Sequence, residues 1–154
     1  MAVTKVIGAW DKENLHIKVY SLPDLSTNAT SWETMHTIDF TESGRNEELY
    51  SFWAILYIRK QYTGDANDWG YVRFLITFED GTTDTVSTSV NQDDAKLWIF
   101  SYNSSKRIAK IEIQGYVVNT DTAVEVCTDT SAVWNEEETM YASRIIYVST
   151  GTYA

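Results

Sequence analysis

The feature that most restricts the fold is a short-range alternation of apolar and polar residues. Leu15, Ile17 and Val19 alternate with polar or amphipathic neighbours, and the pattern recurs over residues 111–116 and 124–126. Successive side chains of a β-strand point to opposite faces of the sheet, so a period of two indicates a strand with one buried and one solvated face. These runs predict an antiparallel sheet that exposes one face to water.

The residue types agree with this pattern. Aromatic residues make up 14% of the chain, Val, Ile and Thr are abundant, and Leu is scarce. β-Branched and aromatic side chains favour the half-buried, pleated surface of a strand, and their combined apolar area excludes a disordered chain. The composition therefore predicts an all-β protein.

Asp80-Gly81 lies between two strand-like runs and is the clearest turn in the sequence. An Asp-Gly pair in this position is a strong hairpin signal, because Gly reaches positive φ without steric cost. Turns recur at intervals of roughly 8–12 residues, and no internal repeat is present. We predict a single domain over residues 1–154, an antiparallel β-sandwich or jelly roll of about nine to eleven short strands, with one helical turn at 135–138.

Two segments, residues 49–58 and 97–100, are apolar at both odd and even positions. A strand of this kind either has both faces covered within the protein or lies at an interface between subunits. A helix is the alternative for the first segment, although its β-branched and aromatic content favours a strand. A small sandwich readily buries only one face of a strand, so we predict a homo-oligomer.

Charge and hydrophobicity exclude several classes of protein. The formal charge is −10, whereas a nucleic-acid binder needs clustered Lys and Arg. The longest apolar run, residues 52–58, is far shorter than the roughly 20 residues of a membrane span. The first residues lack the pattern of a signal peptide, so the expected location is cytoplasmic, virion-associated or reached by a non-classical export route. The single Cys127 excludes an intramolecular disulfide framework.

The sequence contains no motif for a catalytic nucleophile, a cofactor or a metal cluster, so we predict a protein that is not an enzyme and has no cofactor or metal site. Residues 65–70 match the opening of a calcium loop only in part. Trp69 and Ile76 occupy positions where an EF-hand needs oxygen ligands, which excludes that motif. The alternative to a protein without metal is a calcium site formed by acidic residues from separate loops, with Asp93, Asp94 and Asp121 as candidates.

Aromatic residues beside polar loops are the more informative candidates for binding. Trp69 lies in a polar loop with Asp65, Asn67 and Asp68, and Trp32 follows another loop. A flat aromatic ring bordered by hydrogen-bonding side chains suits a sugar, which has apolar C–H faces and hydroxyl edges. The alternative is that Trp69 folds inward and covers the end of the sandwich.

Two functional hypotheses follow from these features. The first is a non-enzymatic carbohydrate-binding domain, lectin-like or a carbohydrate-binding module, that uses loops at one end of the sandwich. The second is a structural protein of a virion or surface assembly, such as a phage head or tail decoration or fibre component, whose role is oligomerisation. The sequence resembles no single family closely enough to decide between them, and fold class alone does not fix function.

Overall fold

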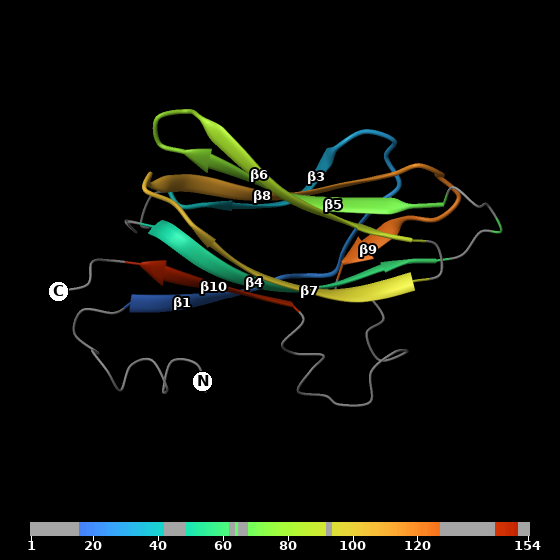
Figure 1. Ribbon diagram of the computed structural model, residues 1–154, viewed down its shortest axis with the longest axis horizontal. Coiled ribbons are helices and arrows are strands. Elements are labelled where there is room, and N and C mark those ends of the chain that lie inside the picture. The colour runs from blue at the N-terminus through green and yellow to red at the C-terminus, as the bar shows by residue number, and fades with distance from the viewer. Residues whose placement is uncertain are drawn as a thin grey trace.

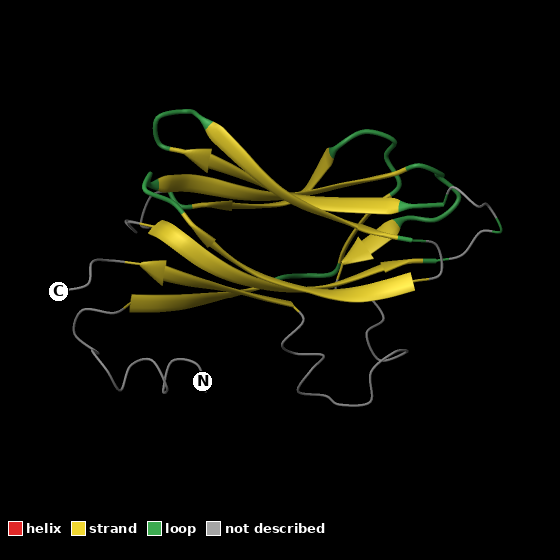
Figure 2. Cartoon of the chain, viewed as in Figure 1, coloured by secondary structure: helices red, strands yellow, loops and turns green. Residues whose placement is uncertain are grey.

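The structure is a computed structural model that describes residues 16–41, 49–61, 64, 68–91, 94–126 and 144–150. These residues form ten strands and no helix, arranged as two antiparallel sheets that face one another (Figures 1 and 2). Sheet A contains β1 (His16–Ser21), β2 (Leu25–Thr27), β4 (Leu49–Lys60), β7 (Asp94–Asn103), β9 (Val124–Val126) and β10 (Arg144–Thr150). Sheet B contains β3 (Glu33–Asp39), β5 (Gly70–Phe78), β6 (Thr83–Val90) and β8 (Ile108–Val117). The predicted all-β antiparallel sandwich is confirmed.

The strand pairings are nested around one turn. β5 pairs with β6, β4 with β7, β3 with β8, β2 with β9, and β1 with β10. The chain therefore resembles one long hairpin folded over on itself. Counted from the turn outward, the first four pairs lie in sheets B, A, B and A, and the last pair, β1 with β10, also lies in sheet A. Two sheets connected in this way form a jelly roll.

The tip of this long hairpin is the predicted Asp80-Gly81 turn. The Gly81 N–H donates to the Phe78 carbonyl at 3.0 Å, and the Phe78 N–H donates to the Thr82 carbonyl at 2.9 Å. Gly81 has a φ of 86°, which completes a three-residue hairpin loop of the kind that ends in a left-handed residue. The predicted turn and its positive φ are confirmed.

The core lies between the two sheets and is built by alternate residues. In β5 every second residue from Gly70 to Phe78 is buried, and in β4 the inward residues Phe52 and Leu56 are at most 2% exposed. Phe52 stacks on Phe74 across the gap between the sheets, with ring centroids 5.6 Å apart. Full burial of one such side chain contributes about 1.5–3 kcal/mol, so this layer dominates the stability of the fold.

β4 is a strand and not a helix, and it runs through the interior of sheet A. β7 pairs along one edge of it, whereas β10 and β9 follow one another along the other edge. Its outward residues are covered unevenly: Tyr57 is 1% exposed and Trp53 is 48% exposed. The expectation that both faces of this strand are covered within the protein therefore holds only for part of its length.

The described residues do not include two features singled out in the sequence, the predicted helical turn at 135–138 and Cys127. Within the described part of the chain, no helix is long and apolar enough to cross a membrane.

Candidate functional site

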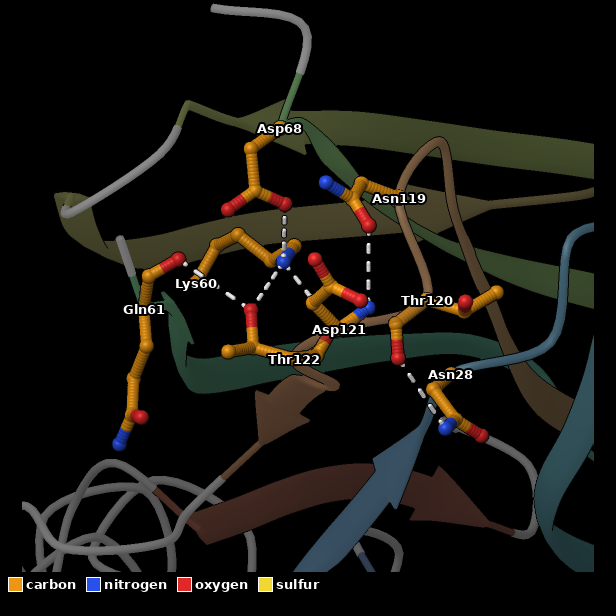
Figure 3. Close-up of polar contacts among 8 residues, drawn as sticks. All are labelled: Asn28, Lys60, Gln61, Asp68, Asn119, Thr120, Asp121 and Thr122. Atoms are coloured by element: carbon orange, nitrogen blue, oxygen red, sulfur yellow. Dashed lines mark hydrogen bonds and ion pairs between the residues drawn. The ribbon is translucent and has the colours of Figure 1, made fainter. Parts of the chain in front are cut away.

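Asp68, predicted to border a ligand, lies inside the protein and faces Lys60. Both side chains are 0% exposed, and the Lys60 ammonium forms an ion pair with the Asp68 carboxylate. The same ammonium donates to the Thr122 carbonyl at 2.9 Å and to the Thr122 hydroxyl (Figure 3). Lys60 ends β4 of sheet A, Asp68 precedes β5 of sheet B, and Thr122 precedes β9. The buried ion pair therefore joins three segments at one end of the sandwich.

The rest of the predicted loop is only partly described. Asp65 and Asn67 lie outside the described residues. Trp69 is half-buried, and its carbonyl accepts a hydrogen bond from the Val118 N–H at 3.1 Å. Immediately after it, a Cβ at Gly70 would lie 2.7 Å from Val124, so the backbone is packed closely here. The loop meets the end of β8 at Trp69, while the Asp68 carboxylate turns inward.

Trp32 belongs to a different surface, the outward face of sheet B. Its ring meets Tyr116 edge-on, with centroids 4.6 Å apart, and the Arg73 guanidinium lies 4.2 Å from the Trp32 ring centroid. Tyr116 in turn stacks on Tyr71, its directly opposite neighbour on β5, at 4.6 Å and an interplanar angle of 7°. These four residues form what we call the Arg73 cluster, together with Gln114, which accepts a hydrogen bond from Arg73.

Four members of this cluster were not among the predicted site residues: Tyr71, Arg73, Gln114 and Tyr116. A usable pattern was present, because all four occupy the outward positions of β5 and β8, which alternate with core residues. Aromatic residues at such positions on neighbouring strands meet across the sheet when the two strands are paired. The pairing itself was not deducible, because two strands, β6 and β7, separate β5 from β8 in the sequence.

The outward face of sheet A is apolar along β4 and β7. Ile55 lies directly opposite Ile99, and Tyr57 lies opposite Leu97. Ile99 is 61% exposed and Leu97 is 37% exposed. Tyr57 is covered within the protein, and we call Trp53, Ile55, Leu97 and Ile99 the sheet A apolar face. The one charged residue at an outward position of these two strands is Arg59, which forms an ion pair with Glu125 at 2.9 Å.

Polar side chains join the two sheets where β6 and β7 adjoin. The Lys96 ammonium, on β7, donates to the Thr88 hydroxyl at 2.9 Å and to the Ser89 carbonyl at 3.2 Å. The Tyr102 hydroxyl, also on β7, donates to the Asp84 carboxylate of β6 at 2.6 Å. Partial burial and this hydrogen bond to a carboxylate raise the pKa of Tyr102 to about 12. These contacts provide hydrogen-bond partners for polar side chains along the edge of the sandwich that β6 and β7 form.

The described residues contain no group of three or more His, Cys, Asp or Glu side chains placed to hold a metal ion. Of the residues considered for a calcium site, Asp93 lies outside the described part of the chain. Burial lowers the pKa of His36, which favours the neutral imidazole on β3.

Comparisons with known proteins give a match only at the level of solved structures. No family model matches the chain, and no curated protein matches it. Similar solved chains come from the structures of infectious bursal disease virus Gt strain (8% identity, TM-score 0.43) and Gx strain (10% identity, TM-score 0.48). A third comes from the T13 viral particle of the same virus, with 9% identity and a TM-score of 0.48.

These alignments cover 92% of this chain and 36–38% of the viral chains, so the chain spans well under half the length of the proteins it was compared with. At such identities and TM-scores the likeness carries no argument about what this chain does. The function has to be argued from its own surfaces.

Proposed function

We propose that this domain is a non-enzymatic structural protein that assembles with further copies of itself, using the sheet A apolar face as the contact surface. The observation that carries this proposal is the exposure of Trp53, Leu97 and Ile99 on the outward face of the paired strands β4 and β7. Contiguous exposed apolar side chains of this kind are typical of protein–protein contact surfaces, because removing apolar surface from water is favourable.

The charge distribution favours a second copy of the chain as the partner. With a formal charge of −10, two copies repel one another over most approaches. The outward positions of β4 and β7 carry a single charge, and Arg59 is neutralised by Glu125. Identical acidic molecules can therefore meet at this face without placing like charges in contact.

Sedimentation velocity over a range of protein and salt concentrations tests the proposal. A monomer has a mass of 17.6 kDa, and we expect multiples of this value at micromolar concentration. Salt screens the repulsion between acidic copies and leaves apolar contacts intact, so association should strengthen as the salt concentration rises. A monomer at every concentration and salt level contradicts the proposal, and association that weakens with salt would assign the contact to ionic groups instead.

A virion or surface-assembly component is the narrower form of this proposal. An assembling structural protein should produce ordered, closed or extended arrays, whereas a simple dimer should not. Electron microscopy of the purified protein at high salt distinguishes the two: regular particles or lattices support the virion hypothesis, and uniform small oligomers count against it.

The loop-based carbohydrate hypothesis stays a separate prediction, centred on Trp69. The burial of Asp68 against Lys60 removes one of the polar groups expected to contact a sugar there. Trp69→Ala should abolish binding of any glycan that uses this loop.

A further inference from the structure

Arg73 is held in one orientation by two neighbours. It lies near the middle of β5, with Ser87 of β6 on one side and Gln114 of β8 on the other. Its Nε donates to the Gln114 side-chain oxygen at 2.8 Å, and its guanidinium lies over the Trp32 ring at 4.2 Å. Gln114 is fixed in turn, because its amide nitrogen donates to the Thr34 hydroxyl at 2.9 Å. A chain of hydrogen bonds therefore orients the guanidinium before any ligand arrives.

The charge of Arg73 has no acidic partner among the described residues. Two other arginines in the described part of the chain are ion-paired, Arg59 with Glu125 and Arg107 with Glu79. The acid nearest in register is Glu112, which accepts a hydrogen bond from Thr34 and pairs with Lys110 at 3.7 Å. Only the Nε of Arg73 is engaged by the described residues, so both terminal nitrogens keep their donors.

An arginine without a carboxylate is unusual in a chain that carries 22 acidic and 12 basic residues. Surface arginines in an acidic protein readily gain an acidic neighbour, because the guanidinium binds carboxylates with two parallel hydrogen bonds. Here the strand register instead surrounds Arg73 with an amide, a hydroxyl and aromatic rings. The two terminal nitrogens are thus available to an anion from outside the chain.

An aromatic row borders the guanidinium. Tyr71 and Tyr116 are stacked on each other, Trp32 packs edge-on against Tyr116, and all three side chains are half-buried. The two phenol hydroxyls form no hydrogen bond with other described residues, and the Ser87 hydroxyl beside Arg73 is on an exposed residue. The face therefore offers a fixed cation, an apolar wall and several hydroxyl groups within two rows of one sheet.

We infer that the Arg73 cluster binds a carboxylate-bearing saccharide, such as a uronic acid or a sialic acid unit of a glycan. The planar carboxylate of the sugar matches the two terminal nitrogens of Arg73. The C–H groups of the ring or its substituents match the aromatic wall, and its hydroxyls match the phenol and serine hydroxyls. A neutral sugar would leave the cation unpaired, and a simple inorganic anion would leave the aromatic wall unused.

Nuclear magnetic resonance titrations with matched ligands test this inference. Methyl glucuronide and methyl glucoside differ only in a carboxylate that replaces a hydroxymethyl group, and N-acetylneuraminic acid methyl glycoside supplies a second acidic sugar. We expect at least one acidic sugar to shift the Arg73 Nε–H and the Tyr71 and Tyr116 signals at millimolar concentration, and methyl glucoside to shift none. Equal shifts with acetate or inorganic phosphate reduce the site to an anion contact and overturn the saccharide inference, as does the absence of shifts with both acidic sugars.

Variants separate the geometry of Arg73 from its charge. Arg73→Lys keeps the charge but loses the paired hydrogen bonds and the stacking, so affinity should fall at least about tenfold, and Arg73→Gln should abolish binding. Arg107 lies at the Asp80-Gly81 end of the sandwich. Arg107→Lys is therefore the matched control and should bind as the wild type does. Unchanged affinity in Arg73→Gln, or loss in Trp69→Ala alone, would move the site to the loop and contradict the inference. Because the cluster lies on the sheet opposite the sheet A apolar face, its failure and the failure of the assembly proposal are independent.

Discussion

The outward faces of the two sheets differ in chemistry, although the edge strands that border them, β6 and β7, follow one another directly in the chain. The outward residues of β6 are hydroxylic, namely Thr83, Thr85, Ser87 and Ser89, whereas those of β7 include Leu97 and Ile99. Alternate residues of both strands, including Val90 of β6 and Trp98 and Phe100 of β7, pack in or against the core between the sheets. Alternation therefore identifies which residues face inward, and the chemistry of the outward positions indicates what each sheet contacts.

The largest effect should come from the ion pair between the sheets, which serves neither outward face. Asp68→Asn leaves the Lys60 charge buried without a counter-charge, and we expect a loss of about 3–5 kcal/mol of unfolding free energy. Replacing both residues together, as Lys60→Met with Asp68→Leu, should restore most of the loss, because it removes both buried charges. Chemical denaturation measures both variants. If Asp68→Asn lowers the unfolding free energy by no more than a typical surface substitution does, water reaches the ion pair in the folded protein.

The turn at the tip of the nested hairpins should show a smaller effect. Gly81 has a φ of 86° and nothing lies within 4 Å of a Cβ placed on it, so the cost of Gly81→Val comes from the backbone and not from a clash. A β-branched residue resists this conformation, and we expect a loss of at least about 1 kcal/mol. Thr83→Val, at the exposed first position of β6, serves as the control for adding a valine near the turn. An unchanged denaturation midpoint in Gly81→Val would show that the turn takes another form in solution.

The contact between β6 and β7 should appear as a dependence of stability on alkaline pH. The pKa of Tyr102 is raised to about 12 in the folded protein, from the ordinary value of 10.0. Above the ordinary pKa the unfolded chain loses this proton while the folded protein keeps it, so the stabilisation present below pH 10 is lost as the pH rises toward 12. Tyr102→Phe should flatten this part of the profile of denaturation midpoint against pH. Identical profiles for variant and wild type would show that the hydrogen bond between Tyr102 and Asp84 does not form in solution.

The sequence predicted the elements governed by local rules. Alternation identified the strands, and Asp80-Gly81 identified the central hairpin, because both depend on residues that are neighbours in the chain. The nesting of four further strand pairs around that hairpin was not predicted, because long-range pairing depends on packing between the sheets.

The candidate site illustrates the same limit. Asp68 was predicted to border a ligand because it lies in a polar loop, yet Lys60 occupies the inward register that Phe52 and Leu56 establish along β4. A lysine in a buried register needs an acidic partner, so this position carried a usable signal. What could not be deduced was which of the 22 acidic residues would meet it.

Sedimentation equilibrium of two matched variants tests whether the sheet A apolar face is the assembly surface. Ile99→Lys places a charge on that face, and Thr85→Lys places the same charge on the outward face of sheet B; both positions are exposed, so each should change unfolding free energy by no more than about 0.5 kcal/mol. We expect Ile99→Lys to weaken self-association by at least about tenfold, the effect of roughly 1.4 kcal/mol, and Thr85→Lys to associate as the wild type does. Equal association of the two variants, or weakening in Thr85→Lys alone, would show that the sheet A apolar face is not the assembly surface.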